Sequence, residues 1–155
     1  MLKIAIPSLI TAIFLTTSLP IPAMADDLAA KVHALGKIEA NIWETAAAVF
    51  FHIADHDRES QKTTAVDVTH DETSIGKQIV NLETMNLSKE EAVRFAKIKQ
   101  HWNTLRTKAD ALMSIDFADE KKLEAEDSHL HGYWHATSNL DEEIDAFIES
   151  LTGKR

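Results

Sequence analysis

The sequence contains no cysteine, and it has only four glycines and three prolines in 155 residues. Without cysteine the chain forms no disulfide, no thiolate metal site and no covalently attached haem. The prolines are Pro7, Pro20 and Pro22, so no proline follows residue 22. Because proline and glycine interrupt helices, a long segment that is poor in both favours an all-α fold.

Basic residues are also scarce, since 16 Lys and Arg stand against 25 Asp and Glu, for a formal net charge of −9. Proteins that bind nucleic acid need basic patches to neutralise phosphates, so no nucleic-acid partner is expected. The sequence has no Gly-x-Ser-x-Gly motif, no phosphate-binding loop and no cysteine nucleophile. We therefore expect a protein that is not an enzyme.

The first 25 residues have the pattern of a secretory signal peptide. Lys3 supplies a short charged region, residues 4–19 are mostly apolar, and residues 23–25 are Ala-Met-Ala, a small-x-small cleavage site. A spanning helix is the weaker interpretation, because prolines interrupt an apolar run that is shorter than the ~20 residues a membrane requires. We predict that residues 1–25 are removed and that a single domain, residues 26–155, works in the periplasm or is secreted.

Apolar residues recur every three or four positions in the second half of the chain, as in the seam of a helix bundle. One helix is predicted over residues 89–115, and the capping box that begins at Ser88 opens it. A last helix ends before Gly153, a C-cap glycine, and Asp116 or Asp119 is its expected N-cap. The two seams consist of Phe95, Ile98, Trp102, Leu105, Ala109 and Leu112, and of Leu130, Tyr133, Thr137, Leu140, Ile144, Phe147 and Leu151.

Two further helices are predicted in the first half. The first covers about residues 28–62, and the second covers about residues 70–86, because the threonine-rich stretch 63–73 favours turns. Four helices with short connections pack most simply as an antiparallel, up-down-up-down four-helix bundle. The apolar stripes of these two helices are Leu35, Ile38, Ile42, Ala46, Val49 and Ile53, and Val68, Ile75, Ile79 and Leu82.

Eight histidines are the feature that points to a metal. His52 and His56 are one helical turn apart, and the antiparallel arrangement brings His129 of the last helix to the same end of the bundle. The pair His131 and His135 falls on the outer face, because Leu130 and Tyr133 occupy the seam. His52, His56 and His129 are therefore the candidate ligands of a transition metal or a non-covalent haem. In the alternative interpretation, the histidines are solvent-exposed surface residues that bind no metal.

Aromatic residues offer a second kind of site. Trp43, Trp102, Tyr133 and Trp134 can build an aromatic ligand pocket between helices. The alternative is that Trp102 and Tyr133, which occupy seam positions, belong to the core.

Three stretches of the sequence, residues 75–82, 95–105 and 140–148, resemble segments of a known protein family. The first has the spacing Ile-x3-Ile-x2-Leu, the second surrounds Trp102, and the third combines apolar and acidic residues. Together they resemble the extracytoplasmic four-helix sensor domain of type IV pilus chemotaxis transducers and nitrate/nitrite sensor kinases, over most of residues 35–151. The resemblance implies a sensor bundle that takes a small ligand and can form a homodimer.

In that family the first helix carries a glycine followed by arginines that bind a small anion. Here Gly36 is followed by Lys37 and then by Glu39, so Lys37 is the ligand-binding candidate that the resemblance implies. The chain is expected to be a free-standing relative that acts on another protein. We thus expect a non-enzymatic binding module that recognises a small-molecule ligand or a membrane-protein partner between the first and fourth helices. The alternative is a periplasmic metal or haem carrier.

Overall fold

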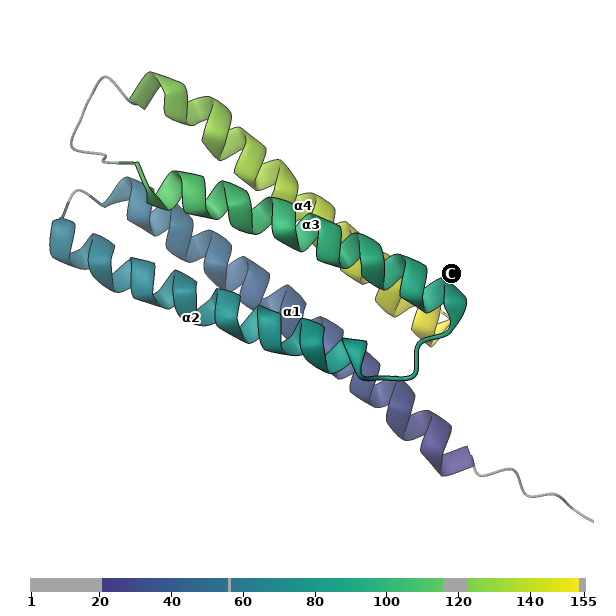
Figure 1. The fold of residues 1–155 in the computed structure, drawn as a ribbon. Helices are drawn as coiled ribbons and strands as arrows, with labels where there is room; N and C mark the ends of the chain where they lie inside the picture. Colours follow the sequence, from purple (N-terminus) through teal and green to yellow (C-terminus); the bar gives the residue numbers. More distant parts are fainter. Residues whose placement is uncertain (1–20, 56, 116–122, 154–155) are drawn as a thin grey trace, which may run out of the picture.

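The computed structural model describes residues 21–55, 57–115 and 123–153, and these residues form four α-helices that run alternately up and down (Figure 1). The prediction of an all-α, up-down-up-down four-helix bundle is confirmed. Most of the predicted signal peptide lies outside the described residues, so its cleavage stays a prediction. The helices are α1 (Ile21–Ala54), α2 (Arg58–Glu83), α3 (Lys89–Met113) and α4 (Leu123–Thr152).

The core consists of the apolar stripes that the sequence spacing predicted. All six seam residues of α3 are buried, and so is the α4 seam between Tyr133 and Phe147. Because single helices are only marginally stable in water, the packing of these stripes against one another holds the four helices together. The stripes of α1 and α2 contribute the buried residues Leu35, Ile38, Ile42, Ala46, Val49, Val68, Ile75, Ile79 and Leu82.

The boundary between the first two helices differs from the prediction. The first helix ends at Ala54 rather than near residue 62, and the second begins at Arg58 rather than near residue 70. Asp57 caps α2, because its carboxylate accepts hydrogen bonds from two backbone N–H groups of the first turn, both at 2.9 Å. An aspartate N-cap is a strong helix start, and it outweighs the weak apolar periodicity of this segment.

The threonine-rich stretch 63–73 is helical, so the expectation of turns there is wrong. Its threonine hydroxyls donate to the carbonyl four residues earlier, at 2.8 to 3.2 Å, and are therefore satisfied without unwinding the helix. Burial of Val68 against the core adds apolar packing that overrides the low helix propensity of threonine. The threonines that form these bonds are Thr63, Thr64, Thr69 and Thr73.

Two of the predicted helix caps are confirmed. The backbone N–H of Glu91 donates to Ser88 Oγ at 3.2 Å, and the N–H of Ser88 donates to the Glu91 carboxylate at 2.6 Å. Gly153 follows α4 with a φ of 67°, the left-handed conformation that glycine adopts at helix ends. The predicted N-caps of the last helix, Asp116 and Asp119, lie outside the described residues.

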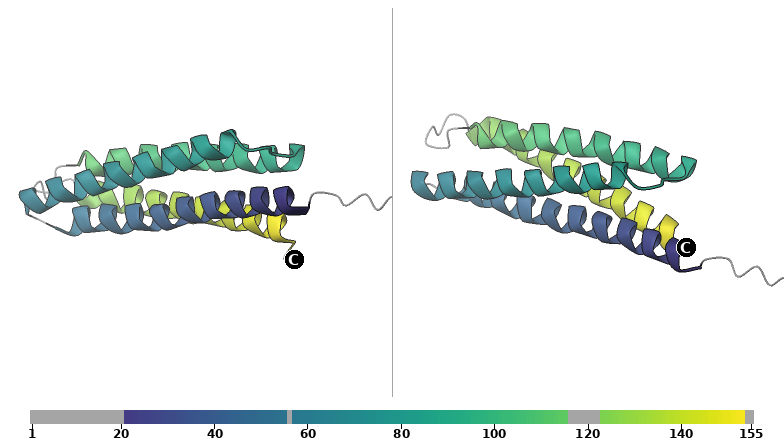
Figure 2. Two further views of the ribbon diagram at one scale, coloured as in Figure 1. Left: turned by 90° about the horizontal axis from the view of Figure 1, so that it is seen from below. Right: turned by 60° about the horizontal axis from the view of Figure 1, so that its bottom comes forward.

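Helices α1 and α4 run side by side along one layer of the bundle, as Figure 2 shows. The end of α1 and the beginning of α4 lie at the same end of the bundle (Figure 1). The contacts between the two helices join Trp43 and Phe50 of α1 to Tyr133, Trp134 and Asp141 of α4. None of the helices in the described part of the chain is long and apolar enough to cross a membrane.

Candidate ligand-binding groove between α1 and α4

Four aromatic side chains from α1 and α4 form one connected cluster. The ring of Trp134 meets the ring of Trp43 edge-on at a centroid distance of 5.8 Å, and it lies 5.8 Å from the ring of Phe50. Phe50 in turn meets Tyr133 edge-on at 6.2 Å. Tyr133 is fully buried, whereas Trp43 and Trp134 are 38% and 45% exposed. The aromatic cluster therefore extends from the core to two partly exposed indole rings.

A hollow of about 640 Å³ opens beside this cluster. Phe50 of α1 lines it together with Ser128, Leu130, His131 and Trp134 of α4, and we call it the α1–α4 groove. Three of these five side chains are apolar and two are polar. That mixture, and a volume between about 300 and 1,000 Å³, are typical of sites for small molecules.

Three carboxylates lie close together on the same pair of helices. Asp141 accepts a hydrogen bond from Trp43 Nε1 at 2.9 Å. Burial raises the pKa of the Glu39 carboxyl, and the negative charges of Asp145 and Asp141 raise it further. Neighbouring negative charges disfavour ionisation of a carboxyl group. A bound cation would therefore lower the pKa of Glu39 and stabilise the three carboxylates in their charged form. We call Glu39, Asp141 and Asp145 the acidic strip.

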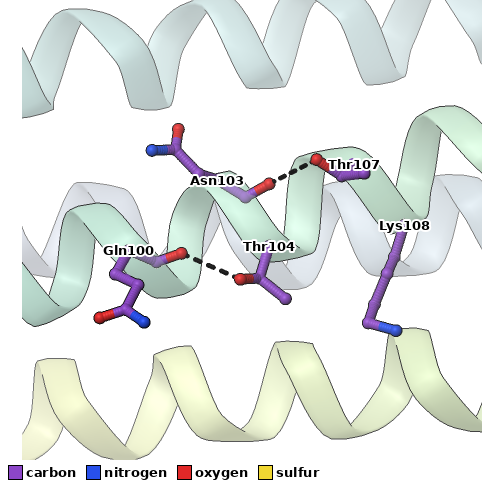
Figure 3. Close-up of a pocket in the computed structure, with 5 residues that line it drawn as sticks. All are labelled: Gln100, Asn103, Thr104, Thr107 and Lys108. Carbon is purple, nitrogen blue, oxygen red and sulfur yellow. Dashed lines mark hydrogen bonds between the residues drawn. The ribbon is translucent and has the colours of Figure 1, made fainter.

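A second hollow, of about 450 Å³, lies on α3 and is shown in Figure 3. The Thr104 hydroxyl donates to the Gln100 carbonyl at 3.1 Å, and the Thr107 hydroxyl donates to the Asn103 carbonyl at 2.9 Å. Two of its polar groups are thus engaged by their own helix. All of its lining residues come from one helix and none is aromatic, so the α1–α4 groove is the better candidate. The lining residues are Gln100, Asn103, Thr104, Thr107 and Lys108.

The structure brings two of the four ligand residues predicted from the sequence together. Trp43 and Tyr133 both belong to the aromatic cluster. Trp102 instead lies in the core on α3, only 6% exposed, and Lys37 is exposed on α1. Burial also raises the pKa of the Tyr133 hydroxyl far above its ordinary value. Tyr133 is therefore a neutral core residue whose ring packs against Phe50, one of the residues that line the groove.

Of the five residues that line the groove, only Trp134 was predicted from the sequence as a ligand residue, and Phe50, Ser128, Leu130 and His131 were not. Phe50 follows the seam residue Val49, and His131 follows the seam residue Leu130. Residues that flank a seam lie at the edge of a helix interface, where a groove opens to solvent. The position of Phe50 and His131 next to seam residues could therefore have identified them as groove residues.

The three predicted metal ligands have different surroundings. His52 is buried, at 7% exposure, and its Nδ1 lies 3.2 Å from the carbonyl oxygen of Gln61 on α2. His129 is exposed on α4, and His56 lies outside the described residues. Within residues 21–55, 57–115 and 123–153, no group of three or more His, Asp or Glu side chains is arranged to hold a metal ion. A metal or haem centre at His52, His56 and His129 stays a prediction.

The helix arrangement and the groove define a four-helix bundle with a small-molecule-sized hollow between its first and last helices. The chain belongs to the family described as the four helix bundle sensory module for signal transduction, whose model matches residues 22–151. This match confirms the resemblance to four-helix sensor domains. No curated protein and no solved structure matches the chain.

Proposed function

We propose that this sensory module binds a small organic cation with an apolar or aromatic body in the α1–α4 groove. The observation that carries the proposal is the contact between the aromatic cluster and the acidic strip, made by the hydrogen bond from Trp43 to Asp141. Exposed indole faces attract cations through their quadrupole, and nearby carboxylates add charge attraction. The apolar part of such a ligand fits against Phe50, Leu130 and Trp134.

The same proposal places the module outside the cytoplasm. Two features support this location, namely the signal-peptide pattern of residues 1–25 and membership of a sensory family. Ligand binding between α1 and α4 would change how these two helices lie against each other. A membrane-protein partner or a second copy of the chain that contacts the same helices would then transmit the signal.

Replacing Trp134 by alanine is expected to weaken binding of phenethylammonium about tenfold, which corresponds to about 1.4 kcal/mol. The loss combines the cation–π attraction with the apolar contact that the indole provides. Isothermal titration calorimetry measures the affinity, and circular dichroism verifies that the variant is folded. Neutral 2-phenylethanol, which has the same ring but no charge, is expected to bind the unaltered protein more weakly than the amine.

Val66→Ala is the matched control, because Val66 is another exposed apolar residue but lies on α2. It is expected to leave the affinity unchanged. Asp141→Asn tests the acidic strip and is expected to weaken binding of the amine but not of the alcohol. Equal affinities for the amine and the alcohol, or an unchanged affinity in Trp134→Ala, would contradict the proposal.

A further inference from the structure

Two exposed histidines on α4 direct the same ring nitrogen toward each other. His131 and His135 are four residues apart, and their Nε2 atoms are 2.9 Å apart. The ring centroids are 4.3 Å apart, and the planes are nearly perpendicular, at 87°. In this pair one ring donates its Nε2–H and the other accepts it. Both Nε2 atoms therefore share one region of space at the helix surface.

This separation is the one that two ligands of a single metal ion have. A transition metal lies about 2.0–2.1 Å from an imidazole nitrogen, so two such ligands at a right angle are about 2.9 Å apart. At a tetrahedral angle they are about 3.3–3.4 Å apart, which a small ring rotation provides. Because the helix fixes residues i and i+4 as neighbours, rotation of the two exposed rings is enough to direct both nitrogens at one ion.

We propose that His131 and His135 form a chelating site for a divalent transition-metal ion, with Cu²⁺ bound most tightly. Imidazole nitrogen suits Cu²⁺, Ni²⁺ and Zn²⁺, and the general order of affinities places Cu²⁺ above the other two. The net charge of −9 favours the approach of a cation to this protein. The site differs from the centre predicted at His52, His56 and His129.

The surroundings of the pair leave room for further ligands. Both side chains are exposed, and His131 also lines the α1–α4 groove. Water or a donor group of a molecule in the groove therefore completes the coordination of the ion. Trp134, which lies between the two histidines in the sequence and also lines the groove, is close enough to report the metal by quenching of its fluorescence.

The test is a titration of the untagged protein with CuCl₂, NiCl₂ and ZnCl₂ at neutral pH, followed by calorimetry. One Cu²⁺ per chain is expected, with electron paramagnetic resonance showing two nitrogen ligands. His131→Gln and His135→Gln are each expected to weaken Cu²⁺ binding about 100-fold, because a chelate becomes a single ligand. Trp134→Phe is expected to remove most of the quenching by Cu²⁺.

His33→Gln is the matched control, since His33 is an exposed helical histidine on α1. It is expected to leave Cu²⁺ binding unchanged. Unchanged binding in His131→Gln or His135→Gln would overturn the proposal, and so would binding that is lost only in His52→Gln or His56→Gln. One ion per two chains would also overturn it, because the site would then need a second copy. The metal titration contains no organic ligand. A failure to bind Cu²⁺ would therefore leave the proposal of an organic cation in the α1–α4 groove unaffected.

Discussion

Replacing Trp102 by alanine is expected to lower the free energy of unfolding by about 3–5 kcal/mol, the range for removing a large aromatic side chain from a core. Trp102 is 6% exposed and lies between Ile98 and Leu105 on the α3 seam, both fully buried. Its removal loses the transfer free energy of the indole and leaves a cavity that neighbouring helices fill only in part. Urea denaturation followed by far-UV circular dichroism measures the change.

Two comparisons separate this core role from a role in ligand binding. Trp102→Phe keeps most of the buried ring and is expected to cost much less than Trp102→Ala. Trp134→Ala removes a half-exposed ring with edge-on neighbours, so it is expected to cost about 1 kcal/mol while weakening ligand binding. A Trp102→Ala variant with unchanged stability and lost ligand binding would instead establish the ligand role predicted for Trp102 from the sequence.

The sequence predicted the fold well where the apolar spacing is regular. On α3 the intervals of three and four residues run without a slip, and the capping box at Ser88 marks the first turn. The pattern fails around residues 54–73, where few apolar residues fix a register. There the capping hydrogen bonds of Asp57 mark the start of α2, the threonine hydroxyls bond to the helix backbone, and Val68 packs into the core. A stripe of apolar residues does not reveal these hydrogen bonds.

The groove was less predictable, because it depends on which faces of distant helices meet. Trp43 and Asp141 are 98 positions apart in the sequence, yet they share a hydrogen bond. Helical periodicity separates buried from exposed faces within one helix, but it does not say which exposed faces become neighbours. The sequence could therefore nominate Trp43 and Tyr133 as ligand residues, but it could not separate them from Trp102.

The histidines show the same limit in a different way. The register predicted that His131 and His135 lie on the outer face, and their exposure confirms this. The sequence-based prediction required metal ligands to converge in the interior of the bundle. It therefore excluded His131 and His135. Spacing on a single helix was sufficient to bring the two Nε2 atoms to 2.9 Å, without help from another helix.

A buried lysine links three parts of the bundle at the end opposite the groove. Lys31 of α1 is 5% exposed, and its Nζ donates to the Asn86 carbonyl in the α2–α3 connection at 2.7 Å. The same nitrogen lies 2.8 Å from the Asp27 carboxylate and 3.3 Å from that of Glu91 on α3. Burial alone would lower the pKa of Lys31, but the hydrogen bonds and charges of Asp27 and Glu91 raise it overall.

Glu91 depends on the same cluster. Burial alone would raise its pKa, but hydrogen bonds from Ser88 and Lys31, with the lysine charge, lower it below the ordinary value of 4.5. A carboxyl whose pKa is lower in the folded than in the unfolded state binds fewer protons when folded. It therefore contributes stability above its unfolded pKa, and this contribution is lost as the pH falls through the folded pKa.

Lys31→Met is expected to lower the free energy of unfolding at neutral pH by about 3 kcal/mol, because it leaves the partly buried Glu91 carboxylate without its cation and removes the hydrogen bond to the Asn86 carbonyl. Lys31→Met combined with Glu91→Gln is expected to recover part of this loss, because the partly buried charge at residue 91 is removed and the Asp27 carboxylate, 42% exposed, is solvated by water. Urea denaturation over a pH series measures both effects. The unaltered protein is expected to lose stability below pH 4.5 more steeply than the double variant, whose residue 91 does not titrate. Parallel pH profiles for the two proteins would mean that Glu91 contributes no pH-dependent stability, and the lysine would then act through its hydrogen bond to Asn86 and its pair with Asp27.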